Sequence, residues 1–84
     1  MKAVKLSAHA LERCRERGAE ESEVTAAIEW GPREPARHGR MLCRLTFPFG
    51  GVWRGKPYAE KQVAAVIEET PTDIVVITVI AHYF

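Results

Sequence analysis

Apolar residues recur at helical spacing in two short stretches near the start of the chain. The first stretch follows Ser7, an N-capping residue, and Leu6 and Leu11 are spaced to form a hydrophobic staple around that cap. The stretch ends at Gly18, which can adopt the left-handed conformation that stops a helix, so we predict a helix over residues 8–17. The second stretch opens with an acid-rich turn and stops at Gly31, which predicts a helix over residues 21–30. Together they predict a short helical hairpin.

Beyond the helices the pattern changes from helical to alternating. The Gly- and Pro-rich residues 31–39 predict a loop, and alternation then predicts a half-buried strand over residues 40–47 with arginines on its outer face. Further glycines and prolines predict an irregular backbone over residues 48–57, apart from a brief extended piece. Residues 61–69 and 73–84 predict a β-hairpin closed by a Thr-Pro-Thr-Asp turn.

The last predicted strand is apolar on both faces. Strict alternation places Val75, Ile77, Val79 and Ala81 on one face, and Ile74, Val76 and Ile80 on the other. Such a strand is central in its sheet or is covered by a second subunit. The order of elements predicts an α+β fold in one domain spanning residues 1–84, with the helical hairpin packed on a three- to four-stranded antiparallel sheet.

Size and composition bear on assembly and location. The 84 residues form a small domain, and a composition of 46% hydrophobic and 27% charged residues is ordinary for a globular chain. Because two short helices cover one face of a sheet, we expect the other face to pair with a second copy in a homodimer.

No apolar run reaches bilayer length, so we expect a cytoplasmic protein without a membrane partner. Cys14 and Cys43 are expected to be reduced and buried.

The sequence offers no motif for a metal or a cofactor. The histidines His9, His38 and His82 fall on different predicted elements and have no His or Cys at ligand spacing. The sequence also lacks a Gly-rich phosphate loop and a nucleophile elbow. We therefore expect neither a metal nor a cofactor.

Three basic side chains share one face of the first predicted helix. His9, Arg13 and Arg17 follow one another at intervals of four residues, so they form a stripe beside the apolar face, at the seam with the packing partner. Like charges at this spacing cost about 0.2–0.5 kcal/mol on an exposed helix, and the stripe therefore suggests an anionic ligand such as phosphate. The competing interpretation is a solvated mixed-charge face, since Glu12 and Glu16 lie nearby.

The net charge of +1 hides a cationic middle segment. Residues 33–57 contain six basic residues and one acidic residue, a net charge of +5. Basic and aromatic residues interleave there in a way that suits single-stranded RNA, whose bases stack and whose phosphates need cations. The competing interpretation is that the arginines protect a sheet edge and the aromatic residues anchor the fold. The candidate RNA-binding residues are Arg40, Arg44, Arg54, Lys56 and Tyr58.

The helix motif and the last strand together resemble a known family. The motif Ser7-x-His9-x-x-x-Arg13-x-x-x-Arg17-Gly18, followed by a sheet ending in the run Val75-Val76-Ile77-Thr78-Val79-Ile80, resembles a widespread family of small bacterial domains of unknown function. That family is similar to the RelE-type toxins and, more distantly, to the barnase-like ribonuclease fold. The resemblance covers nearly the whole chain. It implies a RelE-like fold, with RNA and a cognate antitoxin-like protein as partners, although a fold does not fix a function.

If the resemblance extends to activity, the reaction is metal-independent endonucleolytic cleavage of RNA by transfer of the phosphodiester to its own 2′-hydroxyl. That reaction needs a base, an acid and cations around the phosphate. The resemblance assigns the catalytic roles to His9 as base or acid and to Arg13 and Arg17 as phosphate clamps. His82 is a second acid–base candidate, against the simpler interpretation of an exposed terminal histidine. The alternative function is a non-catalytic module that binds nucleic acid or protein, since no paired acid and base stand out.

Overall fold

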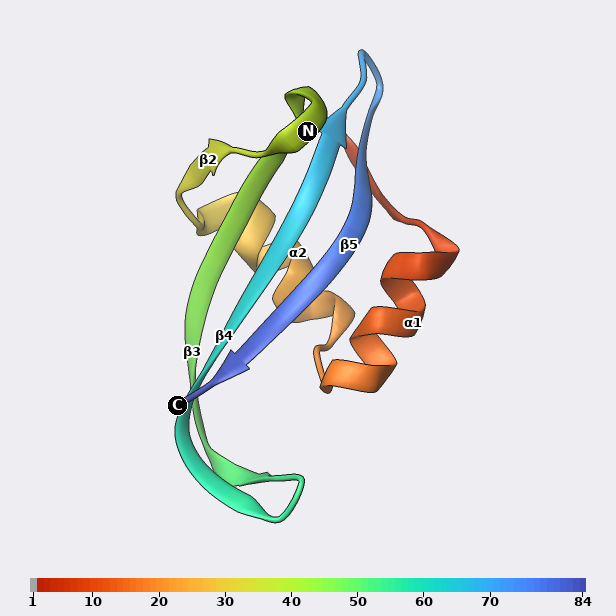
Figure 1. The fold of residues 1–84 in the computed structure, drawn as a ribbon. Helices are drawn as coiled ribbons and strands as arrows, with labels where there is room; N and C mark the ends of the chain where they lie inside the picture. Colours follow the sequence, from red (N-terminus) through yellow and green to blue (C-terminus); the bar gives the residue numbers. More distant parts are fainter. Residues whose placement is uncertain (1) are drawn as a thin grey trace.

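In the computed structural model, which describes residues 2–84, two helices pack against one face of a five-stranded sheet (Figure 1). The elements in chain order are β1 (Ala3–Leu6), α1 (Ala8–Arg17), α2 (Glu21–Trp30), β2 (Arg33–Pro35), the 3-10 turn η1 (Arg37–Gly39), β3 (Met41–Trp53), β4 (Lys56–Glu69) and β5 (Asp73–Tyr83). The strand order is β1-β5-β4-β3-β2, with β1 parallel to β5 and every other pair antiparallel. The α+β class is confirmed, but the sheet is mixed and has five strands.

Both helices have the bounds that the sequence predicts. The Ser7 hydroxyl accepts a hydrogen bond from the Ala10 N–H at 3.1 Å, and Gly18 ends α1 in the left-handed conformation with φ of 70°. At the start of α2, the Glu23 carboxylate accepts from the Glu20 N–H at 2.9 Å. None of the helices within residues 2–84 is long and apolar enough to cross a membrane.

The strands depart from the prediction in three places. β1 is held by parallel pairing with β5, some seventy residues away, and β2 forms within the predicted loop by pairing with the start of β3. The prediction of irregular backbone over residues 48–57 is wrong, because β3 and β4 continue as one long hairpin. A register shift between Pro48 and Gly51 absorbs the glycines and the proline.

A β-bulge in β5 overturns the expected alternation of its faces. Val66 pairs with Thr78 but Ile67 pairs with Val76, so Ile77 is an extra residue in β5. Strict alternation fails at this point, and Val79 lies on the same face as Val76. That shared face is the one covered by the helices.

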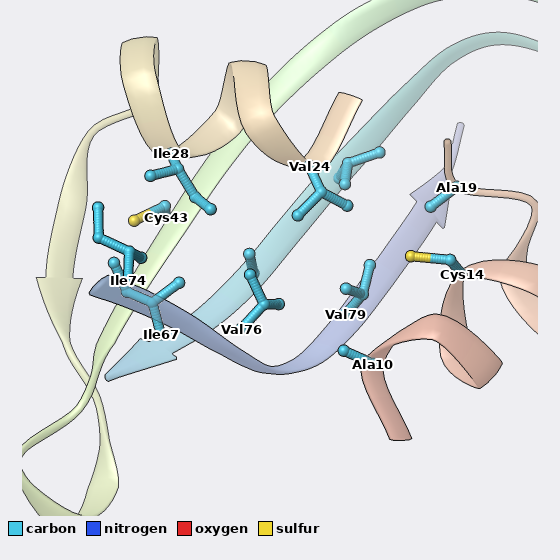
Figure 2. Close-up of a cluster of buried hydrophobic side chains, with 12 residues drawn as sticks. Ala10, Cys14, Ala19, Val24, Ile28, Cys43, Ile67, Ile74, Val76 and Val79 are labelled. Atoms are coloured by element: carbon cyan, nitrogen blue, oxygen red, sulfur yellow. The ribbon is translucent and has the colours of Figure 1, made fainter. Parts of the chain in front are cut away.

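The core between the helices and the sheet is built mainly from small and medium-sized side chains (Figure 2). The buried apolar residues of the described chain are five alanines, two cysteines, four valines and three isoleucines. Cys14 and Cys43 are free and buried, as expected, and burial raises the pKa of both thiols above the ordinary value. Both cysteines therefore act as small apolar core residues rather than as thiolates.

Candidate functional site

The C-terminal end of α1 is fixed to the sheet through three successive carbonyl groups. Such carbonyls have no partner within the helix and carry partial negative charge, so cations and hydroxyl donors are favourable there. The contacts run from Arg54 Nη2 to the Glu16 oxygen at 2.9 Å, from the Tyr83 hydroxyl to the Arg17 oxygen at 2.6 Å, and from Lys61 Nζ to the Gly18 oxygen at 2.7 Å. They bring together the end of α1, the turn of the β3–β4 hairpin and the end of β5.

Lys61 is the buried cation of this junction. Its residue is only 5% exposed, and its ammonium group also pairs with the Glu23 carboxylate of α2 at 2.7 Å. The rings of Phe49 and Tyr83 lie 5.7 and 5.8 Å from the same ammonium group. Sequence analysis missed Lys61, although its place two residues before Val63 on an alternating strand was a usable signal.

An aromatic stack lies beside the junction. The rings of Trp53 and Tyr83 stack with centroids 5.0 Å apart and planes 13° apart, and the Arg54 guanidinium lies 5.2 Å from the Trp53 ring. A Cβ atom at Gly18 would lie 2.6 Å from the Trp53 ring, so the close approach of α1 requires glycine there. Burial raises the pKa of the Tyr83 phenol, so its hydroxyl remains a hydrogen-bond donor at neutral pH.

A pocket of about 240 Å³ opens between α1, the hairpin turn and β5. Its lining residues are Glu16, Arg17, Trp53, Arg54, Ala81 and Tyr83. Arg17 donates to the Val79 carbonyl at 2.5 Å, on the edge of β5 beyond its pairing with β1. A guanidinium carries five N–H donors, and within residues 2–84 Arg17 and Arg54 each use one in a hydrogen bond to protein. Both therefore retain donors for an anion.

Arg54 occupies an unfavourable backbone conformation. Arg54 and Gly55 both have positive φ, 50° and 82°, and Trp53 pairs with Lys56 across them, which defines a two-residue type I′ turn. Asn, Asp or Gly is preferred at the first of these positions, and a left-handed conformation costs most other residues about 1–2 kcal/mol. An arginine in this conformation is locally strained, and strain of this kind clusters at functional sites.

The three stripe residues have different surroundings. Arg17 lies in the pocket, Arg13 forms an ion pair with Glu16, and His9 Nε2 lies 3.3 Å from the Thr78 hydroxyl on β5. The stripe does border β5, as the helical wheel predicts. Along the helix axis, however, His9 and Arg17 are about 12 Å apart, at about 1.5 Å per residue.

The candidate residues of the cationic segment do not form one surface. Arg40 and Arg54 flank β3, which spans about 40 Å at roughly 3.3 Å per residue. Arg44 forms an ion pair with Glu34, and the Nε atom of Arg40 is buried without a hydrogen-bond partner in the described chain. Lys56 is exposed beside the hairpin turn, whereas Tyr58 is half-buried with its ring 5.7 Å from that of Tyr83. Of this set, Arg54 alone lines the pocket that also contains Arg17.

His82 lies away from the pocket. It pairs with Gln62 and is exposed on the face of the sheet opposite the helices, where its ring stacks on Phe84 at 5.3 Å. It therefore does not form an acid–base pair with the stripe. Within residues 2–84, moreover, no three His, Cys, Asp or Glu side chains are grouped to hold a metal ion.

Comparison of the chain with family models, with curated proteins and with solved structures finds no match in any of the three.

Proposed function

We propose that this protein binds single-stranded RNA through the pocket between α1 and the β3–β4 hairpin. The observation that supports the proposal is the meeting of Arg17 and Arg54, from segments 37 residues apart, beside a half-buried aromatic stack. Two planar guanidinium groups match phosphate geometry and stay charged at any physiological pH. The guanidinium planes also offer stacking surfaces for unpaired bases.

The proposal is for binding without cleavage. Cleavage by transfer of the RNA phosphodiester to its own 2′-hydroxyl needs an acid and a base near one phosphate. The pocket lining contains no histidine to fill either role. Glu16 is held by Arg13, and Tyr83 donates to the Arg17 carbonyl with a raised pKa, so neither is poised as a base. The RelE-like relationship and an antitoxin-like partner stay predictions of the sequence resemblance.

Fluorescence anisotropy with a labelled, unstructured ten-nucleotide RNA tests the proposal. Arg54→Gly is the informative variant, because glycine suits the positive φ of this turn position and any lost affinity reports the guanidinium. Arg37→Ala is the matched control, since it removes an exposed arginine near the other end of β3. Each lost phosphate contact should weaken the salt dependence, changing the slope of log affinity against log salt by about 0.7.

We expect Arg54→Gly and Arg17→Ala to weaken RNA binding at least tenfold, with Arg37→Ala close to wild type. Equal losses in all three variants would mean non-specific attraction to a basic protein and would contradict the pocket. The same mixtures, analysed by denaturing gel after long incubation, test cleavage. RNA fragments that disappear with His9→Ala would replace binding by catalysis as the function.

A further inference from the structure

The face of the sheet opposite the helices carries several large apolar side chains. The strand register places Leu42, Val66, Val75, Ile80 and Phe84 on this open face. Ile80 and Phe84 are 45% and 49% exposed. Large apolar side chains also lie on the helix-covered face, where Leu6, Met41 and Phe47 are partly buried against the core cluster. Large apolar residues thus lie on both faces of the sheet, and those of the open face are left without a covering helix in the described chain.

From this distribution we infer that a second copy of the chain covers the open face and forms a homodimer. A domain of this length buries only about 60–65% of its unfolded surface, and a core whose fully buried side chains are no larger than isoleucine adds little margin. Burial of the open face against a partner supplies a second apolar layer. The inference does not depend on RNA binding, because the pocket lies at the opposite, helix-covered side of β5.

The charges of the open face favour a protein partner over nucleic acid. By register, Lys5 and Arg44 lie on this face with four acids, which are Glu34, Glu60, Glu68 and Asp73. Both cations are already paired, Lys5 with Asp73 and Arg44 with Glu34. Glu60 and Glu68 have no cationic partner within residues 2–84 and would repel phosphate.

The size of the face is sufficient for a specific dimer. Neighbouring strands lie about 4.8 Å apart and rise about 3.3 Å per residue. With these spacings, the face formed by β3, β4, β5 and the short β1 and β2 has an area on the order of 600 Å². Two such faces bury roughly 1,200 Å² in total, which is the lower limit of standard interfaces. Two identical sheets also have the same twist, so they can pack face to face in an aligned sandwich with twofold symmetry.

Association through the sheet edges is blocked, which leaves the face. On the edge of β5, the Ser7 hydroxyl and Arg17 donate to the Ile77 and Val79 carbonyls. On the other side, β2 pairs with only the first three residues of β3, and Pro48 farther along lacks an N–H donor. These features disfavour the addition of a further strand to the sheet.

Sedimentation velocity at protein concentrations on the order of 10–200 μM tests the inference, because micromolar dissociation constants can be measured in this range. The wild-type chain should sediment at twice its 9.4 kDa mass. Ile80→Glu places a charge on the proposed interface and should give a folded monomer. Trp30→Glu is the matched control, since Trp30 is 76% exposed on α2 beside a separate apolar pocket, and it should remain dimeric.

A wild-type monomer at the highest concentration would overturn the inference, and so would a dimer that persists in Ile80→Glu. A dimer lost only in Trp30→Glu would move the interface to the α2 side and contradict the open face. Should Ile80→Glu fail to fold, Phe84→Glu removes an apolar contact at the end of the sheet without disturbing the core. Phe84→Glu must then weaken dimerisation at least tenfold, and unchanged dimerisation would refute the open face as the dimer interface. Ile80→Glu monomers should bind RNA with wild-type affinity, which separates a failure here from a failure of the RNA proposal.

Discussion

The two faces of this sheet are made by the same strands but differ in what they contain. The helix-covered face holds the buried apolar core and, at its far end, Lys61 and the aromatic stack that shape a basic pocket. The open face holds partly exposed apolar residues, paired cations and two acids without a cationic partner in the described chain. Alternate side chains along one strand can thus serve separate interactions, which we propose are with an anionic ligand on one face and with a second copy of the chain on the other.

The sharpest way to test this difference is to place the same charge on each face. Val79 is fully buried under the helices and Ile80 is 45% exposed on the other side. Val79→Glu buries a carboxylate without a partner, which costs several kcal/mol and approaches the whole stability of a small domain. We expect Val79→Glu to be unfolded by far-UV circular dichroism and Ile80→Glu to keep the wild-type spectrum. Two folded variants, or two unfolded ones, would show that the faces are not distinct.

The next largest effect concerns the buried cation. Lys61→Ala leaves the Glu23 carboxylate and the Gly18 carbonyl without their donor, so we expect a loss of about 3 kcal/mol in the free energy of unfolding. Urea denaturation measures this loss. Lys56→Ala removes an exposed lysine of the same hairpin and should change stability by less than about 0.5 kcal/mol.

A pair of glycines separates backbone strain from packing at the pocket. Gly18 and Gly39 have nearly equal φ, 70° and 71°, but an added Cβ meets Trp53 and Tyr83 at Gly18 and nothing within 4 Å at Gly39. Gly39→Ala should cost about 1 kcal/mol for the left-handed backbone, whereas Gly18→Ala should cost about 2 kcal/mol because it also displaces the stack. Gly18→Ala should weaken RNA binding as well. Equal costs from thermal unfolding would mean that the stack moves aside freely.

The smallest expected effect is a pH dependence from Tyr83. Burial raises the pKa of its phenol in the folded protein, so the stabilisation is complete below the ordinary value of about 10 and is lost as the pH rises through the folded value. The free energy of unfolding should therefore fall more steeply above pH 10 in the wild type than in Tyr83→Phe. At pH 7, Tyr83→Phe should cost about 1 kcal/mol for the hydrogen bond to the Arg17 carbonyl. Tyr58→Phe is the control, and an identical alkaline profile for both variants would rule out Tyr83 as the source.

The candidate site was predictable only in part. The stripe of His9, Arg13 and Arg17 follows from helical spacing, and its position beside β5 follows from the apolar face of the same helix. Which stripe residue faces a pocket does not follow, because Arg54 reaches that pocket from a hairpin turn 37 residues away. The cationic segment also contained more candidates than the pocket uses, since charge counted along the chain ignores the length of β3.

The sequence alone determined both helices with their ends, the α+β class and the buried state of Cys14 and Cys43. These features depend on local signals, such as a capping hydroxyl, a left-handed glycine and a regular apolar period, which act within a few residues of one another. Tertiary structure alone decided the parallel pairing of β1, the continuation of the β3–β4 hairpin, the bulge at Ile77 and the junction around Lys61. Apart from the hairpin, whose two strands are adjacent in the sequence, these features depend on contacts between distant segments, and the energies of those contacts override the local preferences of the residues involved.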